Sequence, residues 1–375
     1  MDSFNLGRVL LFFFLRWMDG ADADSHWTYK EMAQWSKSFP DCGGVHQSPI
    51  DVETSAVHHD PSLMPVNVVD YHQPGHDPFI LSNNGHTVKM SLPAWFQLGG
   101  LPWRFTAVQL HFHWGREWDG SGGLAGGSEH TVDGRRSAAE LHVVHYNSDL
   151  YPNVSVAQSQ RDGLVVLGVL IETGDDNNSA YENIFKYLEF IKYAGQQMPI
   201  PSFNVRSLLP TDLGRYFRYN GSLTTPPCYQ SVLWTVFAEK VTVTRKQLKN
   251  LETVLFSNDG KDPKSVPLQD NYRTTQPLNH RVVLASFVPD SITSYTLGKL
   301  CAVVVGSLCG LMGLAMVIIL LVKAMSSTSS WEALAAVRPA PSRRSKEHDK
   351  EQKQDTAFNT DPDPEKPEAP PKVEA

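Results

Sequence analysis

The sequence lacks any excess of basic residues. It has 33 lysine and arginine residues against 40 aspartate and glutamate residues, which gives a net charge of −7. Nucleic acid is therefore excluded as the main partner, because such partners select surfaces with clustered positive charge. Cysteine is scarce as well, with 4 residues in 375, so the chain is not a small disulfide-stapled scaffold. With 41% hydrophobic and 19% charged residues, most of the chain is expected to fold.

Long apolar runs are rare in this sequence, and the first lies near the N-terminus. The run 9–15 follows Arg8, and the small residues Gly20 and Ala21 come shortly after it. This order of a basic residue, an apolar stretch and small residues predicts a signal peptide over residues 1–23. The alternative is a buried N-terminal segment of the mature protein.

The second apolar run, 300–322, has no charged residue and is bounded by Lys299 and Lys323. At about 1.5 Å per residue, a helix of this length crosses a hydrocarbon core of about 30 Å. Lysine and arginine are concentrated on its C-terminal side, which predicts a cytoplasmic C-terminus. We therefore expect a single-pass type I protein of the plasma membrane, with residues 24–290 outside the cell and 323–375 as a disordered cytoplasmic tail.

This run also suggests the macromolecular contacts of the chain. The lipid bilayer is one partner, through this one helix. Gly306 and Gly310 form a GxxxG pair within the run, so a homodimer through the span is a further possibility beside simple apolar packing.

The sequence of the outer portion, residues 24–290, predicts a mainly β domain with peripheral helices. Short β-rich runs separated by turn residues recur along it. The strand-like runs are 79–81, 87–92, 107–114, 138–146, 164–172, 231–237 and 281–287, and the best helical candidates are 180–193 and 245–256. Because no linker divides this portion, we expect one large sheet-based domain.

Two features of this portion belong to a secretory environment. Cys42 and Cys228 are its only cysteines, and an even pair in an oxidising compartment is expected to form a disulfide, the alternative being two free buried thiols. Asn153, Asn177 and Asn220 each begin an Asn-X-Ser sequence, the acceptor pattern for glycosylation on an exposed loop.

Histidines on two strand-like runs suggest a metal site. His111 and His113 alternate along one run, so both side chains point to one face. An adjacent strand carrying His142 would supply a third imidazole. Three imidazoles leave one position of a tetrahedral Zn²⁺ open, which is the catalytic arrangement. An HxH pair on its own is more often an ordinary pair of surface or core histidines.

Two polar neighbours strengthen the metal interpretation. Gln109 shares a face with His111, and Glu140 shares a face with His142. Each can hold the outer ring nitrogen of its histidine, which is how ligands of a metal are oriented.

Together with other motifs, these runs resemble the animal, or α-class, carbonic anhydrases. The motifs are QSPID at 47–51, NNGH at 83–86, HFHWG at 111–115, SEHTV at 128–132, ELHVVH at 140–145 and GSLTTPP at 221–227. They occur in the order of the family and cover nearly all of residues 26–288. The cysteine pair and the apolar span make the chain similar to the membrane-bound members. The resemblance implies the α-carbonic anhydrase fold, with a large, mostly antiparallel twisted central sheet, plus one transmembrane helix.

The resemblance also implies roles for individual residues. His111, His113 and His142 would bind Zn²⁺, with the backbone carbonyl of Asn271 holding His113. Thr224 would donate its proton to Glu129, and His86 would be the proton shuttle. The residues expected to contact substrate are Val144, Val166, Leu223, Thr224, Thr225, Val232 and Trp234. Cis peptide bonds are expected before Pro49 and Pro227.

The implied reaction is the reversible hydration of carbon dioxide to bicarbonate and a proton, through attack by zinc-bound hydroxide. The substrates are then carbon dioxide, water and bicarbonate. Two other classes remain possible: a catalytically silent ectodomain for adhesion or ligand binding, and a zinc esterase or peptidase, although HExxH is missing. One departure from the family is the glycine-rich stretch 115–128, which is longer than usual.

Overall fold

The structure is a computed structural model that describes residues 27–72, 75, 77–116 and 126–335. The predicted signal peptide, most of the long stretch 115–128 and the tail from 336 onward lie outside the described residues. The chain divides into a unit that ends at Cys301 and a second unit that begins at Ala302.

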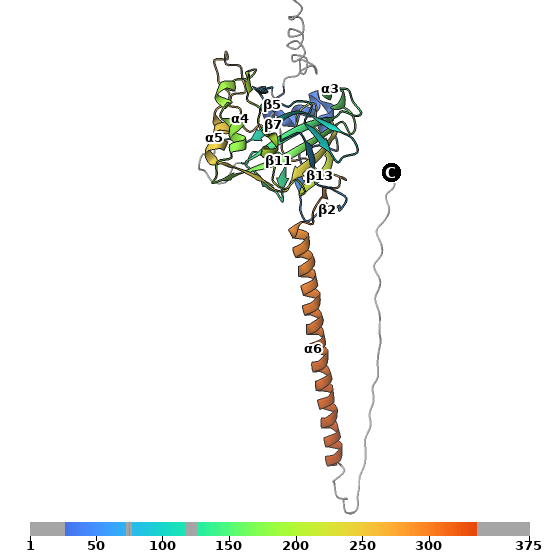
Figure 1. Cartoon of the computed structure of the whole chain (residues 1–375). Helices are drawn as coiled ribbons and strands as arrows, with labels where there is room; N and C mark the ends of the chain where they lie inside the picture. Colours follow the sequence, from blue (N-terminus) through green and yellow to red (C-terminus); the bar gives the residue numbers. More distant parts are fainter. Residues whose placement is uncertain (1–26, 73–74, 76, 117–125, 336–375) are drawn as a thin grey trace, which may run out of the picture. The chain divides into compact units, whose positions relative to one another are not determined.

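A large mixed sheet of 13 strands forms the body of the first unit (Figure 1). In spatial order its main path is β12 (Gln197–Ile200), β4 (Phe79–Asn83), β5 (Val88–Ser91), β7 (Phe105–Trp114), β10 (Ala139–Asn147), β11 (Leu164–Gly174), β14 (Val232–Phe237), β13 (Tyr216–Gly221), β16 (Leu284–Ala285) and β2 (His58–His59). Off this path, β15 (Val241–Thr244) pairs with β11, and β3 (Asn67–Val69) pairs with β6 (Gln97–Gly99), which also pairs with β7. The parallel pairs are β11 with β14, β11 with β15 and β16 with β2, and the other pairs of this sheet are antiparallel.

A second sheet has three strands, and its first strand begins at Asp51, the last residue of the QSPID motif. It consists of β1 (Asp51–Val52), β8 (Thr131–Val132) and β9 (Arg135–Arg136). The predicted mainly β fold with peripheral helices is thereby confirmed. The run 281–287 yields only the two-residue strand β16, because pairing there is limited to Phe217 and Arg218 of β13 and to β2.

The central strands are buried on both faces and therefore separate two hydrophobic clusters. Val165 and Leu167 of β11 point into the larger cluster. Val166, between them, points into the second cluster together with Trp234 of β14. This alternation follows from the period of two in strand side chains, and it gives the second face of the sheet its apolar wall.

Short helices surround the sheet. They are α2 (Trp35–Ser38), α3 (Val154–Ala157), α4 (Ser179–Phe185) and α5 (Arg245–Thr253), with the 3-10 helices η1 (Tyr29–Gln34), η2 (Pro40–Gly43), η3 (Leu188–Ile191) and η4 (Val205–Leu208). The helix predicted over 180–193 is instead α4 followed by η3. The two are separated at Tyr187, whose φ of −103° and ψ of −2° depart from α-helical values. Helix α5 packs beside α4 (Figure 1), where Gln247 donates to the backbone oxygen of Asn178.

The predicted disulfide between Cys42 and Cys228 is confirmed, with the two Cα atoms 4.8 Å apart. The peptide bonds before Pro49 and Pro227 are both cis, as the family resemblance implied. These features place the segment after β13, which includes Thr224 and Thr225, next to η2.

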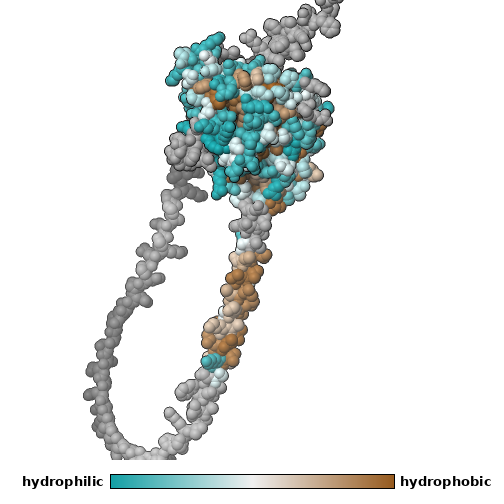
Figure 2. Space-filling model, turned by 60° about the vertical axis from the view of Figure 1, so that its left-hand side comes forward, coloured by the Kyte–Doolittle hydropathy of each residue, from teal (hydrophilic) through white to brown (hydrophobic). Residues whose placement is uncertain are grey.

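Helix α6 (Asp290–Ala335) contains the predicted span. Its portion Gly298–Ser326 is 29 residues long, and it is the one helix of the described residues that is long and apolar enough to cross a membrane. The apolar side chains of this portion are exposed on the helix surface (Figure 2). The helix extends beyond the predicted limits 300–322 on both sides, so the predicted tail begins within it.

Candidate active site

Strands β7 and β10 run antiparallel at the centre of the large sheet and bring three histidines together. In their register, His142 is paired with His111, and Glu140 is paired with His113. A β-bulge between Val144 and His145 shifts the pairing only beyond these residues. The period of two therefore places all three imidazoles on one face of the sheet.

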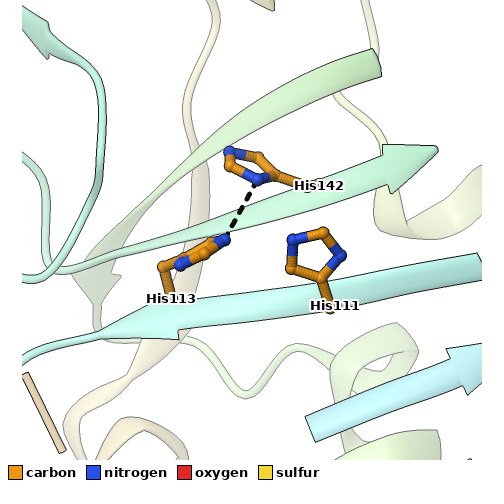
Figure 3. Close-up of side chains that lie close together, drawn as sticks. All are labelled: His111, His113 and His142. Carbon is orange, nitrogen blue, oxygen red and sulfur yellow. Dashed lines mark hydrogen bonds between the residues drawn. The ribbon is translucent and has the colours of Figure 1, made fainter. Parts of the chain in front are cut away.

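The three imidazoles converge on one point (Figure 3). One nitrogen of each ring lies within 4.8 Å of the nitrogens of the other two. His113 Nε2 and His142 Nδ1 are only 3.1 Å apart. His113 and His142 are buried, and His111 is half-buried at the cleft.

The outer nitrogen of each ring donates to a fixed acceptor. His111 Nδ1 donates to Gln109 Oε1 at 3.0 Å, and His113 Nδ1 donates to the backbone oxygen of Asn271 at 2.7 Å. His142 Nε2 donates to Glu140 Oε1 at 2.7 Å. A neutral imidazole has one N–H, so the three inner nitrogens are left as acceptors.

Burial favours the neutral form of His111 and of His113. Desolvation, followed by the neighbouring His113 and His142, lowers the pKa of His111 well below its usual value of 6.5. Desolvation also lowers the pKa of His113, although Glu129 opposes this shift. Two acceptor nitrogens 3.1 Å apart cannot hydrogen-bond to each other, so the inner face of the cluster is suited to a cation.

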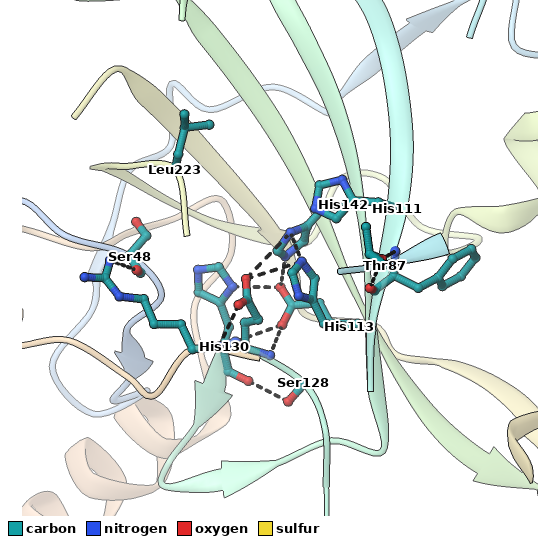
Figure 4. Close-up of polar contacts among 12 residues, drawn as sticks. Ser48, Thr87, His111, His113, Ser128, His130, His142 and Leu223 are labelled. Carbon is teal, nitrogen blue, oxygen red and sulfur yellow. Dashed lines mark hydrogen bonds and ion pairs between the residues drawn. The ribbon is translucent and has the colours of Figure 1, made fainter. Parts of the chain in front are cut away.

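Glu140 is the centre of the polar network around His130 and His142, two of the residues labelled in Figure 4. Its Oε2 accepts from the backbone amides of Glu129 and His130, each at 2.8 Å. Its Oε1 accepts from His142 and from His130 Nδ1, each at 2.7 Å. Burial raises the pKa of Glu140, but attraction and hydrogen bonds from His130 and His142 outweigh it and hold the pKa well below 4.5.

His130 completes this network and is not a ligand. Its Nε2 lies 2.6 Å from Tyr219 Oη, which in turn donates to Ser48 Oγ at 2.9 Å. Both ring nitrogens of His130 are thus engaged with protein groups. His130, Glu140 and His142 also lie close enough to form a metal site, but hydrogen bonds account for the contacts among them.

Glu129 directs a carboxylate oxygen at the same point as the histidines. Its Oε1 accepts from the Arg273 amide at 2.8 Å. Its Oε2 is buried and has no hydrogen-bond donor among the described residues, and it lies 3.4 Å from His113 Nε2 and 3.9 Å from His142 Nδ1. A carboxylate oxygen beside two acceptor nitrogens again fits a bound cation and its ligand. Among the described residues Thr224 makes no hydrogen bond to Glu129, so the donation from Thr224 stays a prediction.

A cavity of about 260 Å³ opens beside the histidines. His111, His142 and Gln109 line it on the side of the cluster. Most of the residues predicted to contact substrate also line it, namely Val144, Val166, Leu223, Thr224, Thr225 and Trp234. Val232 does not line it and packs instead in the hydrophobic cluster behind this wall.

The comparisons with known proteins agree with this geometry. The family model for eukaryotic-type carbonic anhydrases matches residues 30–287. This chain belongs to that family. It is 42% identical to carbonic anhydrase 12 of Homo sapiens over 323 residues, which cover 84% of this chain and 90% of that protein. It is also 42% identical to carbonic anhydrase 6 of Bos taurus over 286 residues, which cover 75% of this chain and 86% of that protein.

As a carbonic anhydrase, the chain is an enzyme for the hydration of carbon dioxide. The likeness to carbonic anhydrase 12 extends past the catalytic domain, because the matched region covers more of the chain than the domain alone. The stretch 216–237 also resembles carbonic anhydrase fourteen, and this finer assignment stays a prediction.

The predicted shuttle of this carbonic anhydrase, His86, lies in the turn before β5. Asn84 Oδ1 accepts from the His86 amide at 2.9 Å, and Asn271 Nδ2 donates to the His86 carbonyl at 3.0 Å. The imidazole stacks on the indole of Trp27, with ring centroids 3.9 Å apart and an angle of 11° between the planes. It is not among the side chains that line the cavity.

Two charged residues of the site were missed by sequence reasoning. Arg273 holds Glu129 through its amide, and its guanidinium donates to Gln47, Ser48 and Cys42. No pattern marked this loop arginine. Lys89 lines the cavity, and its alternation with the buried Val88 and Met90 in a predicted strand was a usable signal.

Both ends of the long stretch 115–128 are described, and each contacts residues of the site. Arg116 donates to Asp270, next to Asn271, and Ser128 Oγ donates to the His130 carbonyl. Residues 117–125, the middle of this stretch, lie outside the described residues.

Proposed function

We propose that this carbonic anhydrase works at the outer cell surface as a zinc enzyme, with His111, His113 and His142 as the ligands of Zn²⁺. The supporting observation is that the three outer nitrogens are committed to acceptors while the three inner nitrogens meet at one point. Nitrogen ligands favour zinc over magnesium or calcium, and three histidines leave one position open for catalysis.

Zinc, when bound, supplies a nucleophile at neutral pH by lowering the pKa of a water ligand. The residues of this chain provide the rest. Val144, Val166 and Trp234 form an apolar wall for carbon dioxide, a substrate without charge to clamp. Thr224 lines the cleft, and the family resemblance implies that its hydroxyl donates a hydrogen bond to Glu129. Its oxygen could then only accept a hydrogen bond from an oxygen nucleophile, which would orient that nucleophile.

His86 carries the released proton to buffer. An imidazole is the side chain best suited to exchange protons with buffer around neutral pH. The hydrogen bond from Asn271 to the His86 carbonyl ties this turn to the loop that holds His113, so the shuttle and a metal ligand share one support.

The site belongs outside the cell, on a single-pass type I protein of the plasma membrane. The apolar portion Gly298–Ser326, the Cys42–Cys228 disulfide and the likeness to carbonic anhydrase 12 support this assignment. Asn153, Asn177 and Asn220 are all exposed, as glycan acceptors must be, although Asn220 lies in β13 and not on the expected loop. The partners are then carbon dioxide, water, bicarbonate and the lipid bilayer. Association of two copies through Gly306 and Gly310 stays a prediction.

The test is to replace one ligand in the full chain and measure zinc and activity together. His142→Ala removes a ligand nitrogen and leaves Glu140 Oε1 without one of its donors. We expect the purified variant to lose stoichiometric zinc by atomic emission and to lose carbon dioxide hydration in stopped flow. The matched control is His280→Ala, which changes an exposed histidine and should alter neither.

Retention of one zinc per chain in the His142→Ala variant would show that the ligand set is wrong. A wild-type chain that binds zinc but does not accelerate hydration would favour the silent ectodomain instead.

A further inference from the structure

One of the three glycosylation sequences borders the active-site cavity. Asn153, Val154 and Ser155 form the start of helix α3. Val154 and Ser155 line the same cavity as His111 and His142, and Gln158 one turn later lines it too. The acceptor asparagine is therefore a direct neighbour of the cleft wall.

The side chain of Asn153 is oriented for modification. Asn153 is exposed and has an extended backbone, with φ of −163° and ψ of 169°. Its Oδ1 caps α3 by accepting from the Val156 amide at 3.0 Å. Within the described part of the chain, its Nδ2 donates to no protein group, so this nitrogen is available while the oxygen fixes the side chain.

The helix that presents Asn153 is anchored to the sheet. Ala157 at its end is fully buried, and Ser231 Oγ, just before β14, donates to the Gln158 carbonyl at 2.5 Å. The base of an attached group would thus keep a fixed position relative to the cavity.

We propose that Asn153 carries an N-linked glycan that screens the mouth of the cleft, admitting carbon dioxide, water and bicarbonate and hindering bulky ligands. The proposal rests on the extracellular location given under the proposed function. In the transfer, Asn153 Nδ2 forms a bond to C1 of a lipid-pyrophosphate-linked oligosaccharide. The bond from C1 to the pyrophosphate oxygen breaks, the lipid pyrophosphate leaves with its electron pair, and the amide nitrogen releases one proton.

The screening follows from relative size. The cavity holds about 260 Å³, which is ample for a three-atom substrate. A chain of several sugars exceeds this volume and moves about its linkage, so it sweeps the space in front of the cleft. The association rate of a ligand depends on the fraction of its approach orientations that can dock. The glycan should therefore lower this rate only for a ligand that fills much of the space in front of the cleft.

The sequence at Asn177 offers a matched control. Asn177 is exposed in the turn before α4, and neither it nor Ser179 lines the cavity. A glycan at Asn177 adds comparable mass and hydration without standing at the cleft.

The experiment compares the full chain from a secretory host with Asn153→Ser and Asn177→Ser. Serine is also a good N-cap, so Asn153→Ser removes the acceptor nitrogen without removing the cap or adding charge. Mass spectrometry of the peptides that contain each asparagine reports the glycans. Association rates are then measured for azide and for an arylsulfonamide coupled to dextran, as a small and a bulky zinc ligand.

We expect a glycan on the wild-type Asn153 peptide. In Asn153→Ser the bulky ligand should associate at least about threefold faster, because more encounters dock. Azide binding and carbon dioxide hydration should be unchanged, and Asn177→Ser should match the wild type throughout.

An unmodified Asn153 beside glycosylated Asn177 or Asn220 would overturn this proposal alone. So would a glycan on Asn153 whose removal leaves the bulky ligand unaffected. Three unmodified asparagines would contradict both the extracellular location and the proposed glycan. Absence of zinc from the wild-type protein would contradict only the proposed zinc site.

Discussion

His145 shows how a single buried residue makes a carbonic anhydrase of this kind sensitive to acid. It follows the bulge in β10, and its Nδ1 donates to the Val165 carbonyl at 3.3 Å while Nε2 accepts from Tyr71 Oη. Desolvation lowers its pKa from 6.5 to about 3. The unfolded chain therefore binds this proton more tightly than the folded chain, and stability falls as the pH drops below about 6.5.

This shift predicts a specific pH dependence. Between about pH 6.5 and pH 3, each unit of acidification should lower the free energy of unfolding by about 1.4 kcal/mol through His145. His145→Gln cannot titrate there, so we expect a lower stability at pH 7, by about 1–2 kcal/mol for the altered hydrogen bonds, but a shallower fall towards acid. Urea unfolding of the detergent-solubilised chain at pH 7 and pH 5 measures both. Parallel falls in wild type and variant would contradict the assignment.

The proton shuttle gives a second prediction at this scale. His86→Ala should lower the turnover number for carbon dioxide hydration by about tenfold or more in weak buffer, because general acid–base groups contribute about 10²–10⁴-fold. Added imidazole should restore much of the rate, since it replaces the missing base. Stopped-flow rates at rising imidazole concentration test this, and a variant that imidazole fails to rescue would remove His86 from the shuttle role.

Some residues of the site could be predicted from the sequence around them, and others could not. Gln109 and Glu140 share strands with the histidines that they hold, so alternation alone placed them. Asn271 is far from His113 in sequence, and only the family resemblance pointed to its carbonyl. Arg273 had no signal at all, because its contacts with Glu129 and Gln47 depend on a loop path that no periodic pattern encodes.

Among the elements, the disulfide joins helix η2 to the segment after β13. The two cysteines are 186 residues apart in sequence. The Cys228 amide donates to the Thr225 carbonyl at 2.9 Å, and the Cys42 carbonyl accepts from Arg273 at 3.0 Å. The bridge therefore supports both the turn that follows Thr224 and the arginine behind Glu129.

Removal of this bridge is expected to cost much of the stability of the domain. In the chain-entropy treatment, a loop of 186 residues is worth roughly 5 kcal/mol as an upper value. The double variant Cys42→Ser and Cys228→Ser should unfold at a clearly lower guanidinium concentration than the wild type. Cys301→Ser, which changes a free cysteine of α6, is the control. Equal midpoints for all three proteins would show that the bridge contributes little.

The elements themselves were predicted to different degrees. Strands β7, β10 and β11 follow from continuous apolar and alternating patterns in the sequence. The break between α4 and η3 did not, because Lys186 and Tyr187 are compatible with a helix and the turn depends on packing of the buried Leu188 and Ile191. Short strands such as β16 and β2 exist through pairing with distant partners, which local preference cannot reveal.

For the whole molecule, we expect the apolar portion of α6 to determine where the enzyme resides. A chain that stops after Pro289 keeps every residue of the site and lacks the span. We expect it to be secreted into the medium with zinc bound and with carbon dioxide hydration per zinc equal to that of the full chain. Immunoblots of medium and carbonate-washed membranes, with activity assays, measure this. A full chain that carbonate extracts from membranes would contradict the span.

The late position of Asn271 in the sequence has a consequence for biogenesis. During synthesis, the three imidazoles leave the ribosome long before the loop whose carbonyl aims His113 and whose amide tethers the turn of His86. A nascent chain that ends before this loop contains all three candidate ligand histidines but lacks the Asn271 carbonyl that orients His113. We therefore expect the catalytic centre to be completed only when this loop has emerged, shortly before the apolar portion of α6 is synthesised.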